Sequence, residues 1–273
     1  MFGTKRRRLS YILILIAVVH YTASTISTLQ AKSKEGSAPQ YALAVVNDDQ
    51  VLHGSHFEAR KRKFSIGEFN ITIRQNWRNL GLGCVVWPAA ELLSILLHDK
   101  KLLAFLNIDV RDKFVVELGA GTGLPSIIAA LSGARLSIAT DRNEIIEKCT
   151  KKNIDSVSEH QENLNLEVLD WDSDSSGSFV KNHGTPDIII GADLIYHESA
   201  FAPLVETLLA LSEGNTQIII TGKERYKRLN QKFLNLLGKF EVTKFGASNL
   251  GKLVSDTRDY VYVITRNDAT CDM

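Results

Sequence analysis

Cysteine is scarce in this sequence, and neither sign of charge is in large excess. The three cysteines, Cys84, Cys149 and Cys271, form no C-x-x-C pair, and the seven histidines show no metal-ligand spacing. We therefore expect no metal site and no disulfide framework, and a reducing compartment is the simplest interpretation of such thiols. A net charge of +1 gives no support for a nucleic-acid partner, because such proteins normally carry a strong basic excess or patch.

Short apolar runs alternate with helical patterns after residue 113, which favours a parallel sheet covered by helices on both faces. The expected strands are 114–118, 136–140, 164–169, 187–190 and 217–221, then an antiparallel pair at 240–245 and 260–265. The expected helices are 145–154, 201–211 and 226–237, whose apolar face from Tyr226 to Leu237 is expected to pack in the core. The polar stretch 172–184 is expected to be a loop. The fold class predicted is Rossmann-like α/β, with a seven-stranded, mostly parallel sheet and a C-terminal antiparallel hairpin.

Residues 55–110 precede this core and are expected to form a β-hairpin followed by helices. Apolar alternation at 57–64 and 69–74 flanks Ile66-Gly67, which is typical of a hairpin. Pro88 follows Trp87 at a position that suits the first turn of a helix, and 102–106 continues as a second helical piece. The expected organisation is an N-terminal segment and linker at 1–40 and one domain at 41–273, with its core at 113–266.

A glycine turn follows the first core strand, with Gly119, Gly121 and Gly123 at alternate positions. Such a turn between a strand and a helix indicates an adenosine-containing cofactor at the carboxyl edge of the sheet. The dinucleotide fingerprint has its third glycine one place later, where this chain has Leu124. Glu117 is also expected to face an approaching pyrophosphate and to repel it. S-adenosylmethionine, which has no phosphate and a positively charged sulfur, suits the turn better.

Side chains able to bind such a cofactor follow the second and third strands. Asp141 ends the second strand, where an acid can accept hydrogen bonds from both ribose hydroxyls. Asp170 and Trp171 follow the third strand, where the indole offers adenine a flat apolar face and the acid can accept from its amino group.

The fourth strand ends in Gly191-Ala192-Asp193-Leu194-Ile195-Tyr196. Loops at this edge carry ligands and catalytic groups in parallel sheets. We expect the small residues Gly191 and Ala192 to leave room for the cofactor. Asp193 and Tyr196 are then expected to present a carboxylate and a phenol beside the methyl donor.

Taken in order, V-V-W-P-A-A, E-L-G-A-G-T-G, T-D-R, D-W and G-A-D-L-I-Y span most of residues 66–266. This ordered set resembles the eukaryotic seven-β-strand lysine methyltransferases of the methyltransferase-like family, which have the class I methyltransferase fold. The resemblance implies methylation of a lysine in a protein substrate, with S-adenosylmethionine as cofactor. It implies cofactor contacts from Trp87, Gly119, Ala120, Gly121, Asp141, Trp171 and Ala192, and a target-lysine channel lined by Asp193 and Tyr196.

The implied reaction is a direct displacement in which the lysine nitrogen attacks the methyl carbon. A lysine ammonium has a pKa near 10.4 and must first lose a proton, which an apolar, aromatic channel favours. Asp193 is expected to orient the ammonium, and Tyr196 to bind the amine or stack against it. Three alternatives stay open: a small-molecule or histidine methyltransferase of the same fold, a non-catalytic binding module, and, less favoured, an NAD dehydrogenase.

Residues 1–40 contain no acid before Glu35. Lys5-Arg6-Arg7-Arg8 precedes an apolar run at 9–19, which is shorter than the about 20 residues of a membrane span. A mitochondrial presequence, a signal peptide and a short signal anchor are all compatible with this pattern. The need for S-adenosylmethionine and the odd cysteines disfavour a lumenal domain, so the mitochondrial presequence is preferred, with a cytoplasmic or membrane-associated protein as the alternative. Contact of this segment with a membrane or import machinery is expected, and a monomer is the default.

Overall fold

The computed structural model describes residues 55–158, 161–250, 253–254 and 256–267. The expectations for residues 1–40, and a domain start at residue 41, lie outside this part of the chain. Within it, no single helix is long and apolar enough to cross a membrane. One bent pair, Trp77–Cys84 with Pro88–His98, passes by length and composition only.

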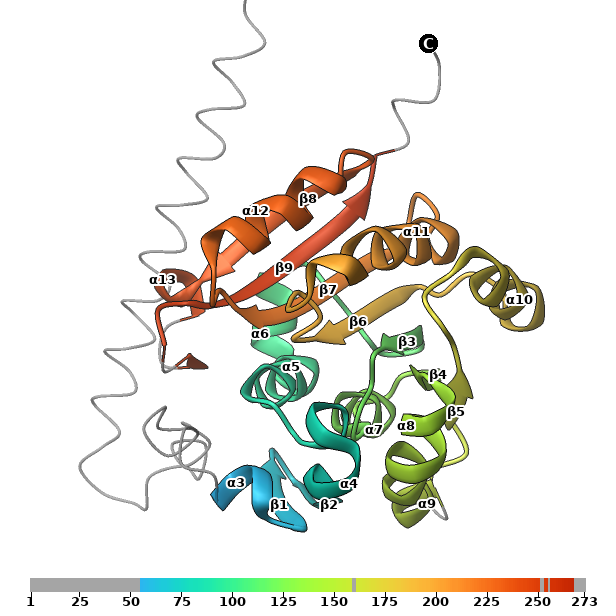
Figure 1. Ribbon diagram of the computed structural model, residues 1–273, viewed down its shortest axis with the longest axis vertical. Helices are drawn as coiled ribbons and strands as arrows, with labels where there is room; N and C mark the ends of the chain where they lie inside the picture. Colours follow the sequence, from blue (N-terminus) through green and yellow to red (C-terminus); the bar gives the residue numbers. More distant parts are fainter. Residues whose placement is uncertain (1–54, 159–160, 251–252, 255, 268–273) are drawn as a thin grey trace, which may run out of the picture. The chain divides into compact units, whose positions relative to one another are not determined.

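The core is a seven-stranded sheet with the order β5-β4-β3-β6-β7-β9-β8 (Figure 1). Its strands are β3 (Phe114–Leu118), β4 (Leu136–Asp141), β5 (Leu164–Val168), β6 (Ile188–Ala192), β7 (Gln217–Lys223), β8 (Phe240–Gly246) and β9 (Asp259–Arg266). The first five are parallel, and β9 runs antiparallel to both β7 and β8. The predicted fold class is confirmed. Because the strand order reverses between β3 and β6, their carboxyl ends form the switch point where ligands bind in such sheets.

Two layers of helices cover the sheet because its strands are apolar on both faces. In β3, for example, Val115 belongs to one buried cluster and Val116 to the other. The first face is covered by α5 (Pro88–His98), α6 (Lys100–Phe105), α7 (Leu124–Leu131) and α9 (Lys151–Ser158). The second face is covered by α10 (Ser173–His183), α11 (Phe201–Leu211) and α12 (Lys227–Leu236). The remaining short elements are α3 (Ser55–Glu58), α4 (Trp77–Leu80), η3 (Gly81–Cys84), α8 (Asn143–Ile145), the π-helical turn η4 (Ile146–Thr150), η5 (Glu198–Ala200) and α13 (Ala247–Leu250).

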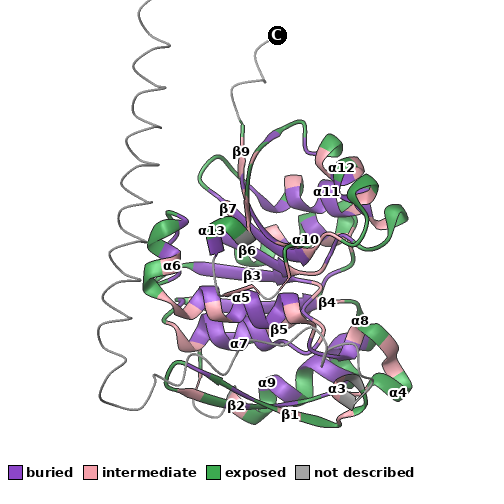
Figure 2. Cartoon of the chain, turned by 90° about the vertical axis from the view of Figure 1, so that its left-hand side faces the viewer, coloured by how far each residue is buried: buried purple, intermediate pink, exposed green. Residues whose placement is uncertain are grey.

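A two-stranded hairpin, β1 (Lys61–Ile66) and β2 (Phe69–Arg74), lies on the far side of α5 and α7 from β3 (Figure 2). Its inward residues join the same buried cluster as those helices. The hairpin was expected from residue 57, but β2 ends at Arg74, which pairs with Lys61. Residues 55–58 therefore have no strand partner and form α3 instead.

The polar stretch after β5 is a helix, α10, so the prediction of a loop at 172–184 is wrong. Asp172 caps its first turn by accepting a hydrogen bond from the Ser175 amide at 2.7 Å, and Gly184 ends it at φ +82°. Phe179 is buried against Phe114 of the sheet. Tertiary packing of one aromatic face thus overrides the low helix propensity of a serine-rich sequence.

Candidate functional site

The glycine turn between β3 and α7 bends the backbone sharply at the switch point. Gly119 has φ +62° and Gly121 has φ +54°, a region that other residues enter only at a cost. A Cβ on Gly121 would lie 3.0 Å from the carbonyl oxygen of Gly83. A Cβ on Gly119 would lie 2.9 Å from the Leu194 side chain. The turn therefore brings bare backbone to the carboxyl edge, where it can approach a ligand closely.

Asp141 ends β4 beside this turn, as predicted. Its Oδ2 accepts from the Gly121 amide at 2.9 Å and its Oδ1 from the Arg142 amide at 2.8 Å. Burial raises the pKa of Asp141, and the two amide hydrogen bonds oppose that effect. Each carboxylate oxygen keeps acceptor capacity, so this rigidly held group fits the two hydroxyls of a ribose.

Glu117 does not face the cofactor edge, so the expectation of a repelling acid there is wrong. Its side chain is 1% exposed, and Oε2 accepts from the backbone amide and the hydroxyl of Ser126 in the first turn of α7. Burial raises the pKa of the Glu117 carboxyl to about 8, so it is mostly neutral at pH 7. Glu117 binds the first turn of α7 beneath the glycine turn. Its side chain therefore does not disfavour a dinucleotide by charge repulsion.

The other predicted cofactor residues lie at the same edge of the sheet and differ in how far they are buried. The Trp171 ring lies 3.5 Å from the position of a Cβ on Gly119, whereas Asp170 is exposed. Ala120 is buried and donates its amide to the Thr140 carbonyl at 2.9 Å, so it adds backbone rather than a side chain. Ala192 is the last residue of β6 and partly exposed.

The small residue Gly191 does not leave room for the cofactor. A Cβ there would lie 2.4 Å from Leu194 Cδ1, so the neighbouring leucine occupies that space. This contact could not be predicted, because it arises only when the loop after β6 folds back over its own strand.

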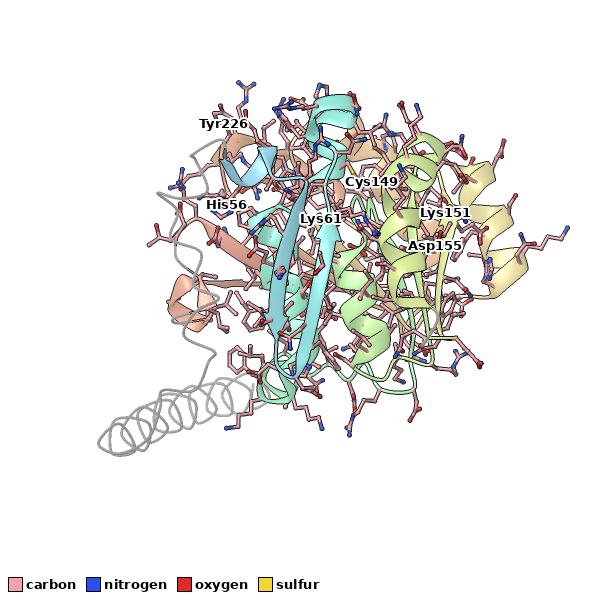
Figure 3. The ribbon with its side chains drawn as sticks, turned by 90° about the horizontal axis from the view of Figure 1, so that it is seen from below. His56, Lys61, Cys149, Lys151, Asp155 and Tyr226 are labelled. Carbon is pink, nitrogen blue, oxygen red and sulfur yellow. A yellow bond between two sulfur atoms is a disulfide. The ribbon has the colours of Figure 1, made fainter. Side chains whose placement is uncertain are left out.

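A disulfide joins Cys84 to Cys149, and the prediction that the cysteines are free is wrong for this pair. Both side chains are buried, and Cys149 is labelled in Figure 3. Their neighbours support the glycine turn: Gly83 lies against Gly121, and the Thr150 hydroxyl donates to the Gly121 carbonyl at 2.7 Å. The residues are 65 positions apart, so spacing could not reveal a pairing made by the packing of η3 on η4.

Asp193 follows β6 with φ +58°, a strained conformation for a residue other than glycine. Its amide donates to the Thr221 carbonyl of β7 at 2.8 Å, and its side chain is 10% exposed. Arg225 binds both carboxylate oxygens, with Nη1–Oδ1 at 2.6 Å and Nη2–Oδ2 at 2.7 Å. This arginine, which follows β7, was not among the predicted site residues.

Trp87 contacts the ion pair between Asp193 and Arg225, and two exposed tyrosines are close to it in sequence. The Arg225 guanidinium carbon lies 5.5 Å from the Trp87 ring centroid, and the Trp87 indole donates to the Leu82 carbonyl at 3.1 Å. Tyr196 is 57% exposed. Tyr226, labelled in Figure 3, is 68% exposed and precedes α12.

The expected core face of α12 is only partly right. Phe233 and Leu237 are buried, as predicted, but Tyr226 and Leu236 are exposed. Tyr226 is the N-cap residue and lies outside the helical repeat that buries the others. A periodic pattern that extends one residue beyond the helix therefore hid a surface aromatic next to Arg225.

A metal site and a cavity at the other edge of the sheet are the two alternatives to a site at the carboxyl edge. Among the residues that the structure describes, no group of three or more His, Cys, Asp or Glu side chains could hold a metal ion. A cavity lined by His98, Lys100 and Arg111 lies near the amino end of β3, and no predicted site residue lines it. The chemistry-bearing residues instead gather at the carboxyl ends of β3, β4, β6 and β7. The hydrogen-bond acceptors, the Trp171 indole and the glycine backbone at this edge suit an adenosine group. The carboxylates of Asp141 and Asp193 and the aromatic side chains at the edge complement it.

Comparison with solved structures shows the same fold. The crystal structure of SMU.776 complexed with SAH matches with a TM-score of 0.52 and 16% identity, covering 76% of this chain and 57% of that one. The Thermus thermophilus 16S rRNA N2 G1207 methyltransferase, in complex with AdoMet and guanosine, matches with a TM-score of 0.50 and 18% identity. That alignment covers 76% of this chain and 50% of that one.

Sequence comparison is more specific. The lysine methyltransferase family matches residues 66–240. Protein N-lysine methyltransferase METTL21A is 39% identical in Mus musculus (74% of this chain, 89% of that one). In Xenopus tropicalis it is 35% identical (72% and 86%), and EEF1A lysine methyltransferase 3 of that species is 28% identical (69% and 77%). The chain therefore belongs to the lysine methyltransferase family and is an S-adenosylmethionine-dependent protein-lysine methyltransferase.

Proposed function

We propose that the methyl group is transferred at the carboxyl ends of β6 and β7, with Asp193 orienting the target lysine nitrogen. The observation that carries this proposal is that the Asp193 carboxylate already binds a cationic side chain, the Arg225 guanidinium. Asp193 presents both carboxylate oxygens to the Arg225 guanidinium from a backbone that is held in a strained conformation. A carboxylate so placed is built to receive a nitrogen donor.

On this proposal, residues of β3 and β4 hold the cofactor. Asp141 accepts from the ribose hydroxyls, the Trp171 indole offers a flat face to adenine, and the Gly119–Gly121 backbone permits close approach. Trp87, at the start of α5, lies on the Arg225 side of the site. When bound, S-adenosylmethionine supplies a methyl carbon made electrophilic by its positively charged sulfur.

The chain's own residues then prepare the nucleophile. A lysine nitrogen attacks only as the neutral amine, so the site must favour loss of its proton. The apolar faces of Trp87 and Tyr196 reduce solvation of the ammonium, which lowers its pKa. The hydroxyl of the exposed Tyr196 can accept from the amine or donate to a protein substrate, while Asp193 fixes the direction of attack.

Several features support a protein rather than a small molecule as substrate. Two large aromatic side chains close in sequence to the ion pair, Tyr196 and Tyr226, are mostly exposed, and tyrosine is enriched at protein interfaces. The relatives are named for lysines of proteins, EEF1A in one case. A lysine of a folded protein partner is therefore the proposed acceptor.

The test is to incubate the protein with tritiated-methyl S-adenosylmethionine and a cell extract, then hydrolyse the labelled protein and separate its amino acids. We expect the label in methyllysine, and its loss with Asp193→Asn. Label in methylhistidine, or only in small molecules, would contradict the proposed acceptor.

We also propose that residues 1–40 direct the protein to mitochondria, and that the protein is a monomer. The lack of acids before Glu35 and the basic and hydroxylated residues support a presequence. The Cys84–Cys149 disulfide removes the support that free thiols gave to a reducing compartment. Fusion of residues 1–40 to a fluorescent protein tests the location: a cytoplasmic or surface-membrane signal would contradict it. Light scattering measures the mass of the purified protein in solution and so tests whether it is a monomer.

A further inference from the structure

The ion pair between Asp193 and Arg225 is not needed to hold the main chain on either side. The Asp193 amide is already bound to Thr221, and the loop after β7 has its own bonds. In that loop the Arg225 amide donates to the Lys223 carbonyl at 2.9 Å, and the Glu224 amide donates to the Arg258 carbonyl at 2.8 Å. The consequence of the pair is therefore mainly electrostatic, because it places a positive charge directly on the carboxylate.

Few other charges face this pair. From β9, Asp259 acts on the Arg225 guanidinium, and the Tyr260 hydroxyl lies near both members. Burial raises the pKa of Tyr260 above its ordinary value, so its hydroxyl is neutral at physiological pH. Asp193 raises the pKa of Arg225, which is therefore always charged. From α5, Trp87 presents an aromatic face and no charge.

We infer that Arg225 is a positioning residue that neutralises Asp193, so that the target lysine meets an ion pair rather than a free carboxylate. This inference rests on the proposed role of Asp193. An unpaired carboxylate beside a lysine favours the ammonium and raises its pKa, typically by about 1 to 3 units. That shift opposes transfer, because only the neutral amine attacks.

The bidentate geometry lets Asp193 keep its orienting role. Each carboxylate oxygen has two acceptor sites, and Arg225 uses one on each oxygen. One site on each oxygen is left for the lysine N–H groups. Arg225 therefore removes the charge effect of the carboxylate without removing its hydrogen-bonding capacity.

The experiment compares Arg225→Gln, which removes the charge, with Arg225→Lys, which keeps it. A matched control is Arg111→Gln, because Arg111 also binds both oxygens of an aspartate, Asp109, at the amino end of β3. The probe is label from tritiated-methyl S-adenosylmethionine recovered as methyllysine from saturating extract protein between pH 6.5 and 9.5. Cofactor affinity is measured separately by calorimetry.

We expect the rising limb of the Arg225→Gln rate profile to move up by about 1 to 2 pH units, within the usual range of such charge effects. At neutral pH this is a loss of about 10- to 100-fold that shrinks as the pH rises. Arg225→Lys is expected to keep the wild-type limb at a lower rate, and Arg111→Gln to keep both. Cofactor affinity of Arg225→Gln should stay within about twofold of the wild-type value if the charge acts on the substrate alone.

A loss that is equal at every pH, or an Arg225→Lys profile displaced as far as that of Arg225→Gln, would overturn the inference. So would an Arg225→Gln protein that no longer binds the cofactor, because the pair would then serve the cofactor pocket. A wild-type protein that makes no methyllysine overturns the proposed function, and this inference with it. An unshifted profile in an active enzyme overturns the inference alone.

Discussion

The cofactor side and the substrate side of the site are built in different ways. At the cofactor side, the glycine turn, Asp141 and Glu117 are fixed by backbone bonds and buried contacts within consecutive elements. At the proposed substrate side, an ion pair links the loops after two strands, Trp87 contacts it, and the nearby sequence carries exposed tyrosines. On the proposed assignment, the cofactor therefore meets backbone and rigidly held side chains, whereas the protein substrate meets side chains that follow the strand ends.

The Cys84–Cys149 disulfide joins the two segments that pack against the glycine turn. Replacing Cys84 and Cys149 by serine opens a link across 65 residues, and we expect the free energy of unfolding to fall by about 4 kcal/mol. The measurement is urea denaturation with and without reductant. Cys271→Ser leaves the Cys84–Cys149 link intact and is the control; we expect it to change stability by less than about 0.5 kcal/mol. Equal stability of the double variant and wild type would contradict the account.

Asp193→Asn should break the substrate side alone. It keeps the shape and replaces one of the acceptor oxygens that orient the lysine nitrogen by an amide donor, so we expect methyllysine formation to fall by about 100-fold, in line with the loss of a hydrogen bond to a charged group. Calorimetry should find cofactor affinity nearly unchanged. A variant as active as wild type would show that Asp193 has no part in transfer.

Glu117→Gln should change how stability depends on pH. A carboxyl whose pKa is raised on folding stabilises the protein below its unfolded pKa, and this contribution is lost as the pH rises toward about 8. Between pH 6 and pH 8 we expect the wild type to lose about 2 kcal/mol relative to the glutamine variant. Parallel stability curves over this range would show that Glu117 is ionised in the folded protein.

Gly121→Ala should loosen the cofactor side with a smaller effect. The positive φ and the nearby Gly83 carbonyl oxygen predict about 1 to 2 kcal/mol of strain, or roughly tenfold weaker cofactor binding. Gly177→Ala is the matched control, since Gly177 lies within α10 and a Cβ there meets nothing within 4 Å. That control should be neutral or stabilising. Equal affinities for both variants would contradict the need for bare backbone at Gly121.

Much of the cofactor side was predictable because its signals are local. A strand end, three alternate glycines and an acid at the next strand end each place a residue without knowledge of distant contacts. The orientation of a side chain is not local: Glu117 points under the turn because Ser126 of the following helix receives it. Likewise, the space beside Gly191 is filled by the Leu194 side chain, a contact that depends on how the loop folds.

Features that depend on two distant segments could not be predicted. Arg225 lies 32 residues from Asp193, and the two meet only because β6 and β7 are neighbours in the sheet. The Cys84–Cys149 disulfide depends likewise on η3 packing against η4. For α10, neither the cap at Asp172 nor the burial of Phe179 that stabilises the helix was identified from the sequence, because the burial depends on packing against the sheet.

The separation of the two sides is tested most directly by calorimetric titration of S-adenosylmethionine into Asp141→Ala and Asp193→Asn in parallel with wild type. We predict that Asp141→Ala weakens binding by at least about tenfold, as loss of hydrogen bonds to a charged acceptor does, while Asp193→Asn binds like wild type. Normal binding by Asp141→Ala, or an equal loss in both variants, would contradict the division into a cofactor side and a substrate side.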